Sequence, residues 1–250
     1  MSTSHYPLGL VLSGGGARGF AHLGVARALY EKGLKPDIIS GVSAGSIVGA
    51  YLAAGFRPES AYDLLKDQNI MKISKISLPK DGLLKMDGLK KTLENHIPYR
   101  KIEDLPIPLV VGVCNLNRAR MEYHRTGPLS DLVLASSSIP VLFSPVRIKG
   151  SVYVDGGVLD NLPVKPVRKL CEKIIAVNIN PVNDTDQLRN LSQIALRTFH
   201  VSFDLGSRQS GKKADLLIEP PGIDQYDILR GKHSAELFDY AYHYTMKLIT

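Results

Sequence analysis

Residues 37–55 read DIISGVSAGSIVGAYLAAG, and this stretch decides the fold of the chain. A short apolar run is followed by a serine framed by two glycines and then by a run of small and apolar residues. This order predicts a strand, a tight turn and a helix. The serine is Ser43, and its framing residues are Gly41 and Gly45. An elbow requires glycines there because the flanking backbone passes too close to leave room for side chains. The helix starting at Ala44 would direct its unpaired amides toward developing negative charge.

This pattern has two interpretations. Gly41-x-Ser43-x-Gly45 is the nucleophile-elbow pattern, in which the turn lifts a reactive hydroxyl above the sheet. It also fits an ordinary connection in which Ser43 only caps the helix. The pentapeptide does not decide between the two, so the rest of the chain must.

The chain before and after this stretch repeats the same kind of unit. An apolar run at residues 8–12 ends at a glycine-rich turn, and helical spacing follows from Ala17 to Lys32. Two strand–helix units in succession predict an α/β fold with a parallel sheet. Further strands are expected at 109–114, 173–179 and 215–218, and hairpins at 109–124 and 146–154. Helices are expected at 59–66, 88–95 (capped by Asp87), 128–137, 164–170, 186–207 and 233–248.

Composition limits the class of protein. The 250 residues are 44% hydrophobic, fit one domain (1–250), and contain no repeat or linker. The net charge of +7 suits anionic partners, and two cysteines without metal-ligand spacing predict free thiols in a reducing compartment. No signal-peptide pattern and no apolar run of about 18 residues is present, which predicts a cytoplasmic protein with at most peripheral membrane contact.

Residues 58–101 interrupt the strand–helix rhythm. From residue 66 to 101 there are nine Lys or Arg against four Asp or Glu. One interpretation is a mobile flap that meets an anionic surface. The other, which we favour, is a solvated charged insertion, because charge runs usually form solvated faces.

The loop Gly14-Gly15-Gly16-Ala17-Arg18-Gly19 also has two interpretations. It satisfies G-x-G-x-x-G, the dinucleotide-binding fingerprint, which further requires an acidic residue at the end of the second strand. Asp37 lies at that strand's beginning instead. The alternative is an anion-stabilising loop of converging amides, with Arg18 adding charge. Parallel strands end at one edge of the sheet, so this loop and Ser43 would lie side by side and form an acyl-transfer site.

A nucleophilic serine needs a base. None of the histidines after Ser43 lies in a glycine-framed turn after a strand; these are His96, His124, His200, His233 and His243. Structural roles explain His200, His243 and the upstream His22 better. Asp155 stands out because it ends a predicted strand and precedes Gly156 and Gly157. It also fits a turn aspartate bonded to its own backbone. The pattern favours a Ser43–Asp155 dyad, whose carboxylate needs a raised pKa to act as a base.

The chain resembles the patatin-like phospholipases, and among them the small single-domain bacterial members related to the neuropathy target esterase branch. Four blocks within residues 8–163 carry the resemblance; they are the Gly14–Gly19 loop, the Gly41–Gly45 elbow, residues 135–140 (ASSSIP), and Asp155-Gly156-Gly157 followed by residues 161–163 (NLP). The resemblance implies a three-layer α/β/α fold, Ser43 as nucleophile, and Asp155 as its partner. It also implies oxyanion donors at Gly15 and Gly16, support of the loop by Arg18, and no metal or other cofactor.

We therefore predict a lipid acyl hydrolase that cleaves phospholipid or lysophospholipid esters through an acyl-enzyme. The Gly14–Gly16 amides and the Ala44 amide would stabilise the oxyanion. The partner would be a lipid ester, with peripheral contact to an anionic membrane and no nucleic acid. Three alternatives stay open: a Ser–His–Asp esterase, a nucleotide-binding oxidoreductase, and a non-catalytic membrane-binding adaptor.

Overall fold

The computed structural model describes residues 5–66, 86–182, 188, 191–228 and 231–250. All described strands belong to one eight-stranded sheet in the order β5-β6-β3-β2-β1-β7-β8, with β4 also paired to β3. The strands are β1 (Tyr6–Leu12), β2 (Ile38–Gly41), β3 (Leu109–Asn115), β4 (Arg120–His124), β5 (Val146–Ile148), β6 (Ser151–Asp155), β7 (Cys171–Val177) and β8 (Leu216–Ile218).

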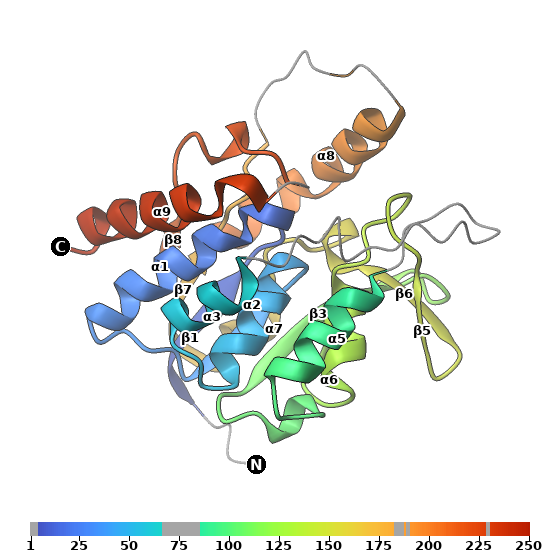
Figure 1. The fold of residues 1–250 in the computed structure, drawn as a ribbon, viewed down its shortest axis with the longest axis horizontal. Helices are drawn as coiled ribbons and strands as arrows, with labels where there is room; N and C mark the ends of the chain where they lie inside the picture. Colours follow the sequence, from blue (N-terminus) through green and yellow to red (C-terminus); the bar gives the residue numbers. More distant parts are fainter. Residues whose placement is uncertain (1–4, 67–85, 183–187, 189–190, 229–230) are drawn as a thin grey trace.

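Helices surround this sheet (Figure 1). The α-helices are α1 (Phe20–Glu31), α2 (Ala44–Ala53), α3 (Pro58–Leu65), α5 (Asp87–His96), α6 (Leu129–Ser136), α7 (Lys165–Arg168), α8 (Leu191–Gly211) and α9 (Ser234–Leu248). Short 3₁₀ turns are η1 (Gly16–Gly19), η2 (Ile102–Asp104), η3 (Gly156–Val158), η4 (Ile223–Gln225) and η5 (Gly231–His233). The α/β fold with a mostly parallel sheet is confirmed.

The sheet has a parallel part and an antiparallel part. Strands β3, β2, β1, β7 and β8 are parallel neighbours. Strands β4 and β6 run antiparallel to β3, and β5 pairs antiparallel with β6. The central strands β2 and β3 are buried along their whole length, and β1 and β7 are buried over their last four residues, as a sheet covered by helices requires.

Strand β3 joins the two parts. Val113 pairs with Glu122 of β4 and with Asp155 of β6, so these strands occupy opposite edges of β3. Val111 pairs with His124 of β4 and with Gly41 of β2, so β2 also lies opposite β4. Therefore β2 and β6 share one edge of β3 and meet end to end, two residues apart. The ends that meet are the elbow after Gly41 and the carboxylate-bearing end at Asp155.

The two faces of the sheet are covered unequally. On β1, Leu10 and Leu12 belong to the larger apolar core, which includes residues of α1, α2, α5, α6 and α9. Val11 points to the other face, where a smaller core includes Leu162, Val164 and Val167 around the single-turn helix α7. The three expected layers are therefore present. The third layer is thin, because a turn segment covers part of that face of the sheet.

The two ends of the predicted 58–101 flap belong to the packed body. Ala61 and Leu65 of α3 are buried, and so are Leu89 and Leu93 of α5. Residues 67–85, which hold the centre of the predicted flap, lie outside the described residues. Cys114 and Cys171 are free and buried, as predicted.

Candidate active site

Ser43 sits on the predicted turn between β2 and α2. Its backbone has φ 53° and ψ −125°, a conformation that non-glycine residues rarely adopt and that costs roughly 1–3 kcal/mol. Its side chain does not cap the helix. A Cβ on Gly41 would collide with the carbonyl oxygen of Gly45, and a Cβ on Gly45 would collide with the carbonyl oxygen of Leu12, so both positions require glycine. The strain and the missing cap favour the elbow over the simple helix cap.

Ser136 holds this turn to β3. Its hydroxyl donates to the Gly112 carbonyl oxygen at 2.7 Å and accepts from the Ser43 N–H at 2.9 Å. It therefore connects the strained residue to the backbone of β3 at the point where β2 gives way to β6. Ser137 and Ser138 instead donate to carbonyl oxygens one turn back in their own segment. The sequence contained this serine within the 135–140 block but gave no sign of which of the three serines would reach the elbow.

Asp155 ends β6 and is buried. Its backbone N–H donates to the Ser138 carbonyl, and its Oδ1 accepts from the Gly157 N–H at 2.8 Å. Its Oδ2 has no hydrogen bond of normal geometry to any described residue. Burial raises the pKa of Asp155 to about 7, while the nearby Ser43 hydroxyl and the Gly157 N–H lower it. The carboxyl group thus has a free oxygen, a serine hydroxyl within interaction range, and a pKa suited to a base at neutral pH.

The glycine loop lies against the elbow. A Cβ on Gly14 would lie 3.1 Å from the Ser43 Cβ, and one on Gly19 would lie 3.1 Å from the Ala44 Cβ. The Gly14 N–H donates to the Asn161 carbonyl at 3.2 Å, so this amide is already engaged. The N–H groups of Gly15, Gly16 and Ala44 donate to no described residue. Of the predicted donors, these three remain available to an anion.

Arg18 holds the glycine loop in place through hydrogen bonds of its guanidinium group. Its guanidinium donates to the carbonyls of Tyr226 and Asp224 and to the Asn180 Oδ1, at 2.7–2.9 Å. Burial lowers its pKa to about 10, so the group stays charged at neutral pH. All three contacts lead away from Ser43 to segments after β7, which makes Arg18 a support of the loop.

Two further residues brace the site, and the sequence analysis gave them no such role. His22 is fully buried, and its Nε2–H donates to the Ser13 carbonyl at 2.8 Å. Burial lowers its pKa to about 4, so it is neutral. The Asn161 side chain lies against both Gly14 and Gly157, and its Nδ2 has no partner among the described residues. Asn161 therefore connects the loop after Asp155 to the loop after β1.

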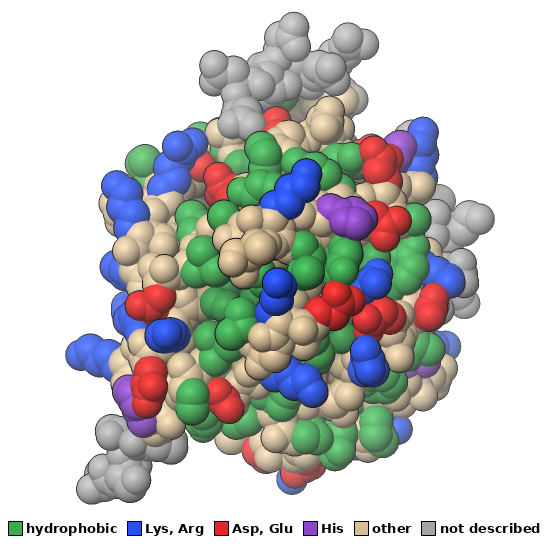
Figure 2. Space-filling view, turned by 90° about the vertical axis from the view of Figure 1, so that its left-hand side faces the viewer, with side chains coloured by type: hydrophobic (Ala, Val, Ile, Leu, Met, Phe, Trp, Pro, Cys, Tyr) green, Lys and Arg blue, Asp and Glu red, His purple; other side chains and the backbone are tan. Residues whose placement is uncertain are grey.

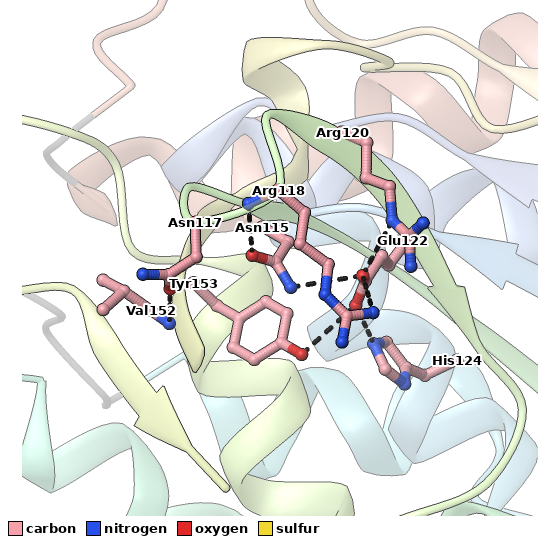
Figure 3. A network of polar contacts seen from close by, with 8 residues as sticks. All are labelled: Asn115, Asn117, Arg118, Arg120, Glu122, His124, Val152 and Tyr153. Atoms are coloured by element: carbon pink, nitrogen blue, oxygen red, sulfur yellow. Dashed lines mark hydrogen bonds and ion pairs between the residues drawn. The ribbon is translucent and has the colours of Figure 1, made fainter. Parts of the chain in front are cut away.

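Three of the other histidines bond to groups other than Ser43. His96 bonds to the Tyr51 hydroxyl, His124 to Glu122 and His233 to Glu236. Burial lowers the pKa of His200 of α8 to about 4, and the charges of Arg18 and Arg197 lower it further. Its neighbour Phe199 covers the Gly157 turn, with its ring edge 3.1 Å from the position of a Gly157 Cβ. His124 belongs to another network, in which it lies 3.5 Å from Glu122 (Figure 3).

Among the described residues, neither the acidic group of a dinucleotide site nor a set of metal ligands is in the required position. The Asp37 carboxylate accepts from the Leu8 N–H at 2.8 Å, at the far edge of the sheet from the glycine loop. Within the described part of the chain, no three His, Cys, Asp or Glu side chains gather in a way that could hold a metal ion. None of the described helices has the length and apolar character of a membrane span.

The fold and this site define an α/β protein that presents a strained serine and a buried carboxylate at the carboxyl edge of its sheet. The sequence pattern of the family "Patatin-like phospholipase" matches residues 10–168, and the chain belongs to that family.

Relatives agree with this assignment. The chain is 34% identical to an uncharacterized NTE family protein of Mycobacterium bovis over 174 residues, which are 68% of this chain and 48% of that protein. It is 28% identical to a Lysophospholipase NTE1 of Meyerozyma guilliermondii, over 99% of this chain and 19% of that protein. The chain thus spans half or less of the length of these relatives. The crystal structure of VipD from Legionella pneumophila has the same fold, with a TM-score of 0.58, 18% identity, and coverage of 98% of this chain and 67% of that one.

Proposed function

We propose that this protein is a serine acyl hydrolase that cleaves carboxylic ester bonds of phospholipids or lysophospholipids. The observation that carries the proposal is the end-to-end meeting of β2 and β6 on one edge of β3, with Ser43 at one end and Asp155 at the other. The family membership and the name of the yeast relative support a lipid ester as the substrate. Peripheral contact with an anionic membrane belongs to the same proposal.

The chemistry follows from the positions of the groups. The Ser43 Oγ attacks the ester carbonyl carbon while Asp155 Oδ2 takes the hydroxyl proton. The oxyanion is bound by the N–H groups of Gly15, Gly16 and Ala44, and removing one such donor typically costs a hundredfold or more in kcat. Collapse of the tetrahedral intermediate breaks the ester C–O bond, and the leaving alcohol takes the proton from Asp155. Water, deprotonated by Asp155, then releases the fatty acid and restores Ser43.

The test is labelling by a fluorophosphonate probe together with hydrolysis of lysophosphatidylcholine. Wild type should be labelled and active, Ser43→Ala should be neither, and Asp155→Asn should lose turnover while keeping its fold. Labelling that persists in Ser43→Ala would reject the nucleophile. Loss of activity in His200→Ala together with activity in Asp155→Asn would establish the histidine alternative instead.

A further inference from the structure

Two hairpin turns project beyond the dyad at the carboxyl edge of the sheet. The β3–β4 turn covers residues 116–119, and the β5–β6 turn is Lys149-Gly150, with both φ angles positive as a two-residue hairpin turn requires. The turns are joined by two hydrogen bonds. The Leu116 N–H donates to the Val152 carbonyl. The Val152 N–H donates to the Asn117 Oδ1 (Figure 3). Asp155 lies four residues along β6 from Ser151, so the turns extend roughly 13 Å past it. We call residues 116–120 and 147–150 the hairpin surface.

The hairpin surface is basic. It contains Arg118, Arg120, Arg147 and Lys149 and no acidic residue. The side chains of Arg118 and Arg120 are 60% and 57% exposed, and Arg147 and Lys149 are exposed as well. Glu122, which is 14% exposed, pairs with Arg118 at 3.8 Å and with Arg120 at 3.1 Å (Figure 3), and no ion pair of Arg147 or Lys149 is present among the described residues. One carboxylate among four cations leaves this end of the molecule positive.

Apolar side chains are exposed near the same edge. Leu116 is half exposed within the hairpin surface. Val141 follows the segment whose Ser138 carbonyl holds Asp155, and Leu159 follows the turn after Asp155; both are also exposed. The side of the molecule on which α1 and α9 end differs, because Figure 2 shows Lys and Arg interspersed with Asp and Glu there. Positive charge beside exposed apolar groups is the combination that binds an anionic lipid surface.

We propose that the hairpin surface docks the protein on anionic phospholipid membranes, with the carboxyl edge of the sheet turned toward the lipid. The inference rests on the proposed function, since it names the surface that would bring Ser43 to its substrate. The arginines and Lys149 would contact phosphate and other anionic headgroups, and Leu116 would insert between them. Because Coulombic attraction to a membrane falls off within a Debye length, the binding should weaken as salt rises.

The test is sedimentation with vesicles of phosphatidylcholine alone and of equal parts phosphatidylcholine and phosphatidylglycerol, at low salt. The tip variant is Arg118→Gln/Arg147→Gln/Lys149→Asn, in which asparagine tolerates the positive φ of residue 149. The control variant is Lys32→Gln/Lys35→Gln/Lys169→Gln, which removes the same charge from exposed positions just before β2 and β7, at the opposite edge. Hydrolysis of a water-soluble p-nitrophenyl ester is measured on every form.

Wild type and the control variant should bind the anionic vesicles and not the neutral ones. The tip variant should bind roughly a hundredfold more weakly, given the usual contribution of a cation near an anionic membrane. Leu116→Ser should lower the remaining affinity severalfold, and soluble-ester hydrolysis should not change.

The proposal fails if wild type does not bind anionic vesicles, if the tip variant binds them as tightly as wild type, or if the control variant loses as much affinity as the tip variant. It also fails if the tip mutations weaken vesicle binding only because they convert a dimer into a monomer. Absence of ester hydrolysis in every form would reject the proposed function and leave the vesicle result to stand alone.

Discussion

The parallel and antiparallel parts of the sheet contribute different things to the site. The parallel part supplies Ser43 and the glycine loop, each on the turn that follows the buried carboxyl end of a strand. The antiparallel part supplies Asp155, and its hairpin turns reach out to solvent. Ser136 bridges the two by bonding both Gly112 and Ser43. Ser43 and Asp155, the two residues of the proposed dyad, come together because strands of opposite direction share one edge of β3.

The largest effect is expected from replacing Asp155, the residue that the antiparallel part supplies. Asp155→Asn should lower kcat at least about a thousandfold, because the amide cannot take the serine proton. The double variant Ser43→Ala/Asp155→Asn should be no less active than Ser43→Ala, because residues that act as a unit are not additive. Ester hydrolysis with a soluble substrate measures both.

Asp160 gives the matched control. It is a partly buried aspartate of the same segment, but its carboxylate accepts from the Tyr123 hydroxyl and the Leu162 N–H and lies outside the proposed dyad. Asp160→Asn should cost stability of about 1–3 kcal/mol and less than tenfold in kcat. Equal losses for both variants would mean that Asp155 only maintains the fold.

The pH dependence should follow Asp155. Because burial raises its pKa to about 7, the ionised base is lost below neutrality, and kcat should fall about tenfold per pH unit below 7 and level off above it. A pH–rate profile measures this. A profile unchanged down to pH 5 would contradict Asp155 as the base.

Stability should change in the opposite direction. The pKa of Asp155 in the folded chain lies above the value of about 3.9 for an unfolded chain, so the folded state binds the proton more tightly. Its contribution to the free energy of unfolding therefore declines as pH rises from about 4 to 7. Asp155→Asn removes this cost, and its stability relative to wild type should grow over that range by on the order of 2–4 kcal/mol. Urea unfolding at pH 4 and pH 8 measures the difference, and a constant difference would refute the linkage.

Removing the bridge between the two parts should have a smaller effect. Ser136→Ala deletes the hydroxyl that holds the Ser43 N–H, and we expect a loss of about tenfold to thirtyfold in kcat with little change in KM. Ser137→Ala is the control, because that hydroxyl donates only to the Val133 carbonyl. Similar kinetics for the two variants would remove Ser136 from the site.

Within the parallel part the expected effect is on stability, not on the proposed reaction. His22→Ala leaves the Ser13 carbonyl without its side-chain donor and opens a cavity, which should lower the free energy of unfolding by about 2–4 kcal/mol. His22→Gln, which keeps a donor, should recover part of this loss. Thermal unfolding compares the three proteins. No difference between wild type and His22→Ala would show that the histidine does not brace the loop.

Much of the parallel part could be predicted from the sequence. The predicted strands and helices around Gly14 and Ser43 are present, because each is a local pattern of apolar run, glycine turn and helical spacing. Asp155 could be singled out by its two glycines. The Gly14 amide was predicted as an oxyanion donor, but whether it is free depends on Asn161, which is distant in the sequence. For the same reason the sequence gave no role to Ser136, His22 or Asn161.

The sequence by itself determined that this chain forms a parallel α/β sheet with a serine on an elbow beside a glycine loop. These features depend on neighbouring residues, and local sterics and hydrophobic periodicity specify them. Only the tertiary structure decided that β6 runs back along β3 and stops two residues beyond β2. Strand direction and register over more than a hundred residues depend on how distant apolar faces pack, and no local pattern records that. This packing is what brings the carboxylate of Asp155 to Ser43.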